Sequence, residues 1–389
     1  MTSEYFARSL ELLERFVAFD TTSRNSNLEA IAWIETYLES LGIEARRIEN
    51  TDGTKANLVA TIGPDAPGGI ILSGHSDVVP VDGQRWLSDP WMLTEREGRL
   101  YGRGTSDMKG FLSLVLGHAA LFQRGSRPVH LAISYDEEVG CQGAPAMIEL
   151  LRKDLANPAA AIIGEPSMME VIDGHKGIAV YEVEVRGVAA HSSLPELGVS
   201  ANMAAIKLLS ALDELAEALA RTGEAEDVSD NGFSPPYPTL TVGIIEGGTA
   251  ANILAERATF TFDLRVPPGS PAAEILRPFV ALCDRLDADL KARHPQAGVT
   301  MTRIADAPAL SPAGNEDAAA LVRRLVRTNA PPSKVSYAAE AGQFSEAGFS
   351  TVICGPGSIE QAHQPDEFIA RSQLEAGALF MQALADELR

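Results

Sequence analysis

The spacing of apolar residues between positions 3 and 166 alternates between two patterns. Short continuous apolar runs are typical of strands buried on both faces, whereas apolar residues that recur every three or four positions are typical of amphipathic helices. The predicted strands cover residues 57–62, 70–73, 129–134 and 159–164, and the predicted helices cover residues 3–16, 30–41, 111–124 and 144–154. Strands that alternate with helices predict an α/β layer, with a mostly parallel mixed sheet between helices.

A different pattern begins near Gly177, where apolar and polar residues alternate as in a half-exposed antiparallel strand. We expect strands at residues 178–186, 239–245, 258–266 and 298–304, and helices at residues 199–221 and 271–293. This set predicts an α+β domain in which two helices cover one face of a four-stranded antiparallel sheet. After Asp306 the first pattern returns, with a helix at 317–328, an apolar strand from Ser350 and a last helix from Ser372. We therefore expect a first domain (1–177 and 306–389) and a second domain (178–305) inserted into it.

The composition is that of an ordinary globular chain, with 45% hydrophobic and 22% charged residues among 389. A formal net charge of −21 argues against nucleic acid or an anionic membrane as a partner. The N-terminal segment lacks the features of a signal peptide, and the apolar runs are shorter than a membrane span. The scattered cysteines Cys141, Cys283 and Cys354 predict no disulfide framework, so we expect a cytoplasmic setting.

Polar residues follow the predicted strands at the points where the strands end. The strand at 70–73 leads into His75 and Asp77, and side chains at i and i+2 leave a strand from the same face. Asp77 could accept the second ring N–H of a metal-bound His75. Asp107 lies in a glycine-rich loop just before the helix predicted from residue 111. The pattern indicates the first part of a metal site, although a core histidine and an N-cap aspartate would explain it as well.

A pair of glutamates, Glu137 and Glu138, follows the strand at 129–134 in the same way. Neighbouring residues after a strand point in different directions, so one can bind a metal while the other acts as a general base. Solvated surface glutamates also occur in pairs. The position at a strand end, where parallel sheets bind ligands, favours the functional interpretation.

The strand ends and a late polar loop together offer imidazole and carboxylate ligands without sulfur. These are His75, Asp107, Glu138, Glu165 and His363. Such donors suit zinc, cobalt or manganese, and three carboxylates would roughly neutralise two divalent ions that share a hydroxide. The sequence contains no complete dinucleotide fingerprint, P-loop or G-x-S-x-G elbow.

Five motifs in order make nearly the whole chain resemble the M20 family of dinuclear metallohydrolases. They are Ser73-Gly-His-Ser-Asp77, Gly102-Arg-Gly-Thr-Ser-Asp-Met-Lys-Gly110, Asp136-Glu-Glu138, Gly164-Glu-Pro166 and the late His363. The resemblance implies a metallopeptidase-like catalytic domain (1–177 and 306–389) and a lid and dimerisation domain (178–305), through which two chains form a homodimer. It also implies two divalent ions, with zinc as the expected metal and cobalt as a second possibility.

The resemblance further implies how the strand-end residues divide the chemistry. His75 and Glu165 would bind one metal, Glu138 and His363 the other, and Asp107 would bridge the two. Glu137 would be the general base of metal-assisted amide hydrolysis, and Asp77 would support His75.

Three residues of the inserted domain also receive roles from the resemblance. His191, in Ala190-His191-Ser-Ser, would reach the partner's active site and hydrogen-bond the oxyanion, although the bare sequence indicates a surface histidine. Asn252 and Arg265 would form a clamp on the substrate carboxylate. An arginine fork suits that task, although Arg265 is also typical of a strand-end ion pair.

Within the family, residues 174–177, 339–344 and 355–368 look most like acetylornithine deacetylases. The implied reaction is hydrolysis of N2-acetyl-L-ornithine to L-ornithine and acetate, in arginine biosynthesis, with Glu340 as the counter-ion of the ornithine side chain. A solvated loop glutamate is the alternative for Glu340. Ala338-Ala339 stands where those deacetylases more often carry Gly-Thr. A succinyl-diaminopimelate desuccinylase, an aminoacylase, a dipeptidase and an inactive binding homologue therefore stay open as alternatives.

Overall fold

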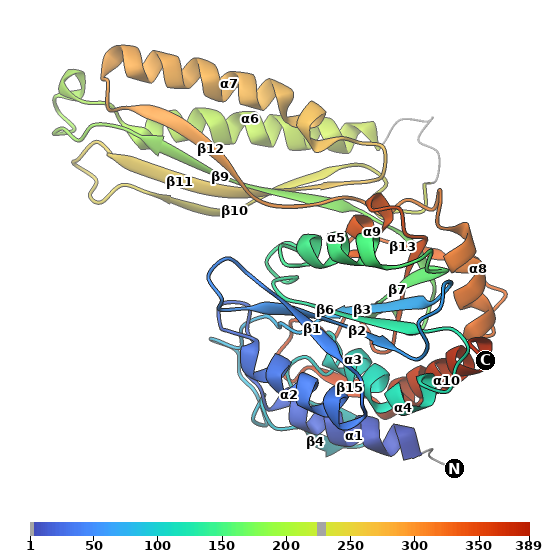
Figure 1. Cartoon of the computed structure of the whole chain (residues 1–389). Helices are drawn as coiled ribbons and strands as arrows, with labels where there is room; N and C mark the ends of the chain where they lie inside the picture. Colours follow the sequence, from blue (N-terminus) through green and yellow to red (C-terminus); the bar gives the residue numbers. More distant parts are fainter. Residues whose placement is uncertain (1–3, 224–230) are drawn as a thin grey trace. The chain divides into compact units, whose positions relative to one another are not determined.

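The structure is a computed structural model that describes residues 4–223 and 231–389. The chain forms two compact units (Figure 1). The first comprises Met1–Gly174, Leu310–Lys334 and Ala339–Arg389, and the second comprises His175–Ala309 and Val335–Ala338. The short segment Val335–Ala338 thus belongs to the second unit, although it lies inside the range 306–389.

An eight-stranded mixed sheet forms the centre of the first unit, in the order β1-β2-β6-β3-β7-β14-β8-β13. Its strands are β1 (Ala45–Glu49), β2 (Ala56–Ile62), β3 (Ile70–His75), β6 (Val129–Ser134), β7 (Ala160–Pro166), β8 (Ile172–His175), β13 (Ser333–Val335) and β14 (Thr351–Gly355). β3 runs parallel to β6 and β7, and β14 runs parallel to β7, so these four neighbouring strands point the same way. Their carboxyl ends meet at one edge of the sheet, where α/β proteins bind ligands.

Helices cover both faces of this sheet (Figure 1). Leu72, Leu131, Ile162 and Val352 point into the larger core. That core is completed by α1 (Glu4–Val17), α2 (Leu28–Ser40), α3 (Lys109–Gly117), α4 (Ala119–Phe122), α8 (Glu316–Leu325) and α10 (Arg371–Glu387). The opposite face is covered by α5 (Ala144–Asp154), which packs on β2 and β6, and by α9 (Ala341–Glu346), which packs on β7 and β14. The predicted mixed sheet between helices is confirmed, and its parallel part is the group β6-β3-β7-β14, whereas β1 pairs antiparallel with β2, β2 with β6 and β8 with β14.

The single helix predicted at residues 111–124 is wrong, because the segment forms α3 and α4 with a break at His118. His118 has φ −98° and ψ 1°, and its ring Nδ1 lies 2.8 Å from the carbonyl oxygen of Leu114. A side chain that hydrogen-bonds a helical carbonyl competes with the backbone ladder. The residue before the break is Gly117, where α1 packs closely: a Cβ at this position would lie 2.2 Å from the Ser9 Oγ.

The short strands were not predicted from the sequence. β4 (Thr94–Arg96), β5 (Arg99–Tyr101) and β15 (Phe368–Ala370) form a three-stranded sheet of their own, in the order β15-β5-β4. Each is three residues long and includes at least one charged or aromatic side chain, so it is too short for an apolar alternation to be recognised. The pairing of β15 with β5 nevertheless places the end of the late polar loop beside the loop that contains Asp107.

A four-stranded antiparallel sheet, in the order β10-β11-β9-β12, forms the second unit. Its strands are β9 (Gly177–Arg186), β10 (Thr239–Gly247), β11 (Arg257–Val266) and β12 (Gly298–Ala307). Two helices, α6 (Ala201–Thr222) and α7 (Ala272–Arg293), pack on one face (Figure 1), and a 3₁₀ helix (Pro195–Leu197) precedes α6. The predicted α+β arrangement of this part is confirmed. None of the helices in residues 4–223 and 231–389 has the length and apolar character that a membrane crossing requires.

Candidate metal centre

The predicted metal ligands of the first unit converge at the carboxyl ends of the parallel strands. His75 is the last residue of β3, and Glu165 is the penultimate residue of β7. Glu138 follows β6, His363 lies in the loop after β14, and Asp107 lies two residues before the start of α3. The order β6-β3-β7-β14 makes these four strands neighbours, so segments far apart in sequence deliver their side chains to one place.

Two glycines allow the start of α3 to approach the strand ends. A Cβ on Gly74 would lie 2.4 Å from the Met108 side chain, and a Cβ on Gly164 would lie 2.1 Å from the Phe111 ring. Each glycine directly precedes a ligand, His75 or Glu165. Because the strands carry no side chain at these positions, the Asp107 segment packs directly on the sheet and its carboxylate comes between the two strand ends.

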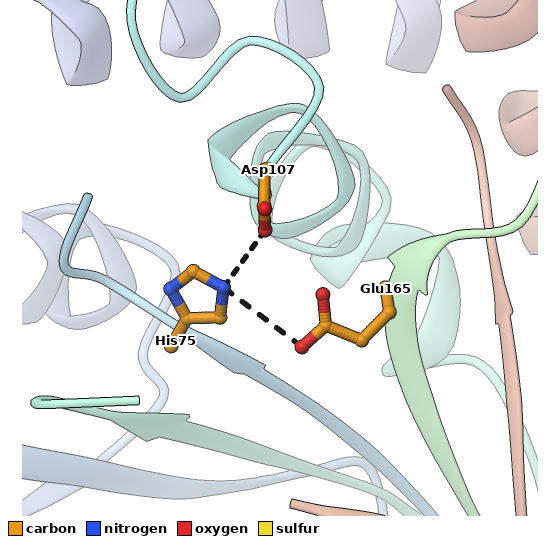
Figure 2. A group of neighbouring side chains, drawn as sticks. All are labelled: His75, Asp107 and Glu165. Atoms are coloured by element: carbon orange, nitrogen blue, oxygen red, sulfur yellow. Dashed lines mark hydrogen bonds and ion pairs between the residues drawn. The ribbon is translucent and has the colours of Figure 1, made fainter. Parts of the chain in front are cut away.

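The first ligand group consists of His75, Asp107 and Glu165, all of them buried (Figure 2). His75 Nε2 lies 3.0 Å from Asp107 Oδ1 and 3.8 Å from Glu165 Oε1. One donor atom from each residue can therefore face a common point. The alternative of an N-cap aspartate is wrong, because Met108 occupies the N-cap position of α3 and no side chain caps that helix.

The second ligand group consists of Asp107, Glu138 and His363. His363 Nε2 lies 2.9 Å from Glu138 Oε2 and 3.4 Å from Asp107 Oδ2. Asp107 thus turns one oxygen to each group, which is the geometry of a bridging carboxylate. The His363 side chain is 50% exposed whereas that of Glu138 is 6% exposed, so the centre opens to solvent on the His363 side.

The residues present fit a pair of divalent ions. Glu138 Oε1 and Glu165 Oε1 are buried and have no hydrogen-bond partner among the described residues, an unfavourable state that a bound cation would relieve. Imidazole nitrogens with carboxylate oxygens are donors suited to zinc, cobalt or manganese. Because its side chain is buried, Glu138 is not a solvated surface glutamate.

The protonation equilibria of the centre also reflect crowded charges. Burial, followed by the charge of Asp107, raises the pKa of Glu138 to about 7 and that of Glu165 well above its usual range. Hydrogen bonds to Asp107 and Glu138 raise the pKa of His363 to about 10. Burial alone would lower the pKa of His75, but Asp107 and Glu165 raise it well above the usual value. Protons therefore occupy the ligands in the absence of cations, and cations would have to displace them.

Asp77 connects the ligand strand to the turn that carries the glutamate pair. The ring Nδ1 of His75 lies 2.9 Å from the backbone carbonyl oxygen of Asp77 and 3.6 Å from its carboxylate. The carboxylate instead accepts the backbone N–H groups of Glu137 (3.2 Å) and Glu138 (3.3 Å) and the hydroxyl of Ser23 (2.7 Å). Its closest contacts thus orient the Glu137–Glu138 turn, and the main partner of the His75 ring is the backbone.

Glu137 lies beside both ligand groups without belonging to either. Its carboxylate Oε1 is 3.3 Å from Cys141 Sγ, which donates to it, and the backbone N–H of Cys141 donates to the Glu137 carbonyl. Burial is the main cause that raises the pKa of Glu137 well above its usual value, with Glu138 and Glu340 adding to it. A buried carboxylate of raised pKa beside two groups of metal ligands is suited to accept a proton.

Sequence patterns missed the residues that support this turn. Lys55 Nζ lies 2.5 Å from Asp136 Oδ1 and also donates to the backbone carbonyl of Ser23. Ser23, Lys55 and Cys141 lie in segments without a strand-end or motif signal. Only the fold brings them to the glutamate pair.

Glu340 is 1% exposed and lies at the start of α9. The alternative of a solvated loop glutamate is therefore wrong. Burial raises its pKa to about 7, against the opposing effects of a hydrogen bond from Ser134 and the charge of His75. Its Oε1 has no hydrogen-bond partner among the described residues.

His191 and Asn252 lie together at one end of the second unit. A β-bridge joins His191 to Ile253, and the backbone N–H of Ser192 donates to the carbonyl of Asn252 at 3.0 Å. The backbone N–H of Ser193 lies 3.2 Å from His191 Nδ1 and the Ser193 hydroxyl lies 2.7 Å from the same nitrogen, so the hydrogen-bond contacts of this ring among the described residues are at Nδ1. Beside this end, the sheet is hollowed by a groove of about 860 Å³.

Arg265 lies at the other end of the same sheet and pairs with Asp263 at 2.7 Å. Asn252 lies in the turn just before Arg257, at the start of β11. From Arg257 to Arg265 the strand extends roughly 26 Å at about 3.3 Å per residue. Asn252 and Arg265 of one chain therefore lie near opposite ends of β11, and their predicted roles on the substrate carboxylate stay a prediction.

Comparison with known proteins is consistent with this centre. The chain matches the family described as peptidase family M20/M25/M40 over residues 71–387. It is 36% identical to the acetylornithine deacetylase of Myxococcus xanthus over 364 residues, which cover 92% of this chain and 91% of that protein. It is 35% identical to the acetylornithine deacetylase of Proteus mirabilis, with 92% and 89% covered. A solved M20 family metallo-carboxypeptidase from Sulfolobus solfataricus superposes with a TM-score of 0.73 at 20% identity, covering 97% of this chain and 98% of that chain.

The fold, the two ligand groups and the adjacent glutamate define a metallohydrolase. The chain belongs to peptidase family M20/M25/M40. Its sequence is similar to acetylornithine deacetylases at moderate identity, and its fold is shared with peptidases of the family.

Proposed function

We propose that this protein hydrolyses the amide bond of an N-acyl amino acid, and that the substrate is N2-acetyl-L-ornithine. The observation that carries the proposed chemistry is the position of Asp107, which turns one carboxylate oxygen to each of two ligand groups beside Glu137. The names of the similar deacetylases support the choice of substrate. We also propose zinc as the metal, with cobalt as a functional substitute, in line with the nitrogen and oxygen donors.

The proposed mechanism assigns each step to a residue of this chain. Two divalent ions, when bound, supply Lewis-acid polarisation and lower the pKa of a water molecule. Glu137 accepts the proton of the attacking water and delivers it to the departing amine. Asp77 holds the backbone of the Glu137 turn, so that the carboxylate stays directed at the reacting atoms.

We further propose that His191 donates a hydrogen bond to the oxyanion of the tetrahedral intermediate. Support comes from the contacts of its Nδ1 with Ser193, which leave Nε2 without a hydrogen bond among the described residues and so available to an oxyanion. Arg265 lies roughly 26 Å along β11 from Arg257, and His191 bridges Ile253 beyond the Arg257 end. This separation suits a homodimer, in which the two chains divide the substrate contacts of each site. Asn252 would act with His191 from one chain, and Arg265 would contact the substrate carboxylate from the other.

The homodimer is supported by an edge of the second unit's sheet that no further strand of the described residues pairs with. β10 is an edge strand, and its Ile244 and Ile245 are 56% and 63% exposed. Unpaired edge strands with exposed apolar side chains favour pairing with another chain. We therefore propose that β10 joins a second copy of this protein.

The proposed substrate is also supported by Glu340. A buried carboxylate oxygen without a hydrogen-bond partner is suited to a cationic group, and the side-chain ammonium of ornithine would supply one. The proposed biological setting is arginine biosynthesis in the cytoplasm. The free thiols Cys141, Cys283 and Cys354 are compatible with a reducing compartment.

A panel of substrates tests the proposed function. Metal-free protein is loaded with Zn²⁺ or Co²⁺ and assayed with acetylornithine, succinyl-diaminopimelate, acetylmethionine and a dipeptide. We expect the highest kcat/KM with acetylornithine. A clear preference for another member of the panel would replace the substrate and keep the chemistry, whereas a loaded protein inert to all four would favour the inactive binding homologue.

A further inference from the structure

A single buried carboxylate, that of Glu367, gathers the backbone of the Asp107 loop. Glu367 Oε1 accepts the backbone N–H groups of Ser106 at 2.9 Å and Asp107 at 3.2 Å. Its Oε2 accepts the backbone N–H of Gly104 at 2.9 Å and one nitrogen of Arg103 at 2.8 Å. Glu367 and Arg103 are each 1% exposed, so this ion pair is buried and both carboxylate oxygens are fully engaged.

The same arginine reaches the loop that carries His363. Arg103 Nη1 donates to the backbone carbonyl of Gln364 at 3.3 Å, and its Nη2 donates to Gln84 Oε1 at 2.5 Å. Gln84 in turn donates through Nε2 to the backbone carbonyl of His363 at 3.0 Å. Glu367, Arg103 and Gln84 thus form one hydrogen-bonded chain between the Asp107 loop and the His363 loop. We call it the loop clasp.

The His363 loop has a backbone conformation that needs such support. His363 and Asp366 have φ values of 63° and 55°, in the left-handed region that residues with a side chain rarely adopt. Non-glycine residues persist there where the surroundings hold them. Contacts that hold this loop include the clasp, the backbone N–H of Gly102, which donates to the Glu367 carbonyl at 3.0 Å, and the backbone N–H of Leu87, which donates to Asp366 Oδ1 at 2.8 Å.

We propose that Glu367 is a positioning residue that fixes the position of His363 relative to Asp107. It would thereby assemble the second ligand group before any cation binds. The inference rests on the proposed pair of metal ions. Glu367, Arg103 and Gln84 would thus organise one of the two metal sites without being metal ligands themselves.

The two ligand groups differ in how much they depend on the clasp. His75 and Glu165 of the first group stand on β3 and β7, where the sheet fixes their backbones. His363 of the second group stands on a loop, and its backbone is tied to the Asp107 loop by the clasp, a few residues before β15 pairs with β5. Loosening the clasp should therefore weaken the second site more than the first, which depends on the clasp only through the shared ligand Asp107. Residues that orient metal ligands typically contribute about 10- to 100-fold to metal affinity.

Three variants test the clasp at different points. Glu367→Gln removes the charge, and Glu367→Asp keeps the charge opposite Arg103 but is too short to reach all three backbone N–H groups. Gln84→Met leaves the buried ion pair in place and removes the bond to the His363 carbonyl. The matched control is Glu95→Gln, which breaks the Glu95–Arg371 ion pair between β4 and the start of α10 without touching either ligand loop.

The readout is Zn²⁺ binding to metal-free protein, measured by calorimetry in competition with a chelator, with circular dichroism to establish folding. Glu138→Gln removes a ligand of the second group alone, and so identifies the binding curve of the first site. We expect a Kd for the second Zn²⁺ that is about 10- to 100-fold higher in the three clasp variants, and wild-type binding in the control. If Glu367→Gln does not fold, Glu367→Asp and Gln84→Met decide the matter.

Two results would overturn the inference. One is wild-type affinity for both Zn²⁺ ions in folded Glu367→Asp and Gln84→Met. The other is an equal loss at both sites, which would make Glu367 a general support of the fold. The proposed metal pair is tested separately in the same experiment, because it fails if the wild-type protein itself binds fewer than two Zn²⁺ ions.

Discussion

Replacing Glu137 by glutamine should separate catalysis from metal binding. Glutamine keeps the size of the side chain and can still accept the thiol of Cys141, which lies 3.3 Å from the carboxylate. It cannot take up the proton of the attacking water. Glu137 belongs to neither ligand group, so Glu137→Gln should retain two bound ions and lose turnover.

The expected loss in kcat can be bounded from the surroundings of Glu137. A positioned general base contributes about 10²- to 10⁴-fold, which corresponds to roughly 2.7–5.4 kcal/mol of activation free energy. The neighbouring carboxylates cannot readily replace it, because Glu138 is engaged with His363 and Asp107 with His75 and His363. We therefore expect a loss in the upper part of that range, about 10³- to 10⁴-fold.

The assay compares kcat for acetylornithine with bound metal measured on the same samples by elemental analysis. Glu138→Gln is the matched control, since it changes the adjacent residue in the same way but removes a ligand. It should lose about one ion per chain together with activity. Full metal content with near-normal kcat in Glu137→Gln would refute the base role, and loss of an ion from Glu137→Gln would make Glu137 a ligand.

Three further predictions concern proton competition, assembly and the substrate side chain. The pKa of His363 is raised to about 10 and that of His75 lies well above normal, so Zn²⁺ must displace protons from these ligands. The affinity for Zn²⁺ should therefore fall as pH is lowered from about 8 to 6, and calorimetry in buffers of different ionisation enthalpy should show proton release. A pH-independent Kd would contradict the assignment. Ile245→Lys should give monomers by light scattering after size-exclusion chromatography if β10 forms the dimer, whereas an unchanged dimer would place the interface elsewhere. Glu340→Gln should raise KM for acetylornithine about tenfold or more, because the side-chain ammonium loses its counter-ion. KM for acetylmethionine, which lacks the ammonium, should stay unchanged. Equal effects on both substrates would rule out the counter-ion role.

The convergence of the ligands could be predicted from the sequence because one physical rule governs it. Parallel strands end at a common edge, so His75, Glu138 and Glu165 had to approach one another once the apolar runs before them were recognised as strands. Asp107 followed from its place before a helix that packs on the same sheet. The glycines at 74 and 164 could have been recognised as signs of close packing only with the fold in hand.

Other features depend on contacts between distant segments that no local pattern encodes. The Glu367 carboxylate binds backbone N–H groups more than 250 positions earlier in the chain, and every residue type offers such groups. The burial of Glu340 follows from a helix of six residues, which is too short to give a periodic signal. The separation of Asn252 from Arg265 depends on the register and length of β11, which motif resemblance does not specify.

The central claim is that Asp107 bridges two divalent ions held by separate ligand groups. A crystal structure of the Zn²⁺-loaded protein, with anomalous data collected at the zinc absorption edge, tests it directly. We predict two anomalous peaks about 3.5–4 Å apart, one beside His75 and Glu165 and the other beside Glu138 and His363, with one Asp107 oxygen on each. A single peak, or two peaks that do not share Asp107, would contradict the account.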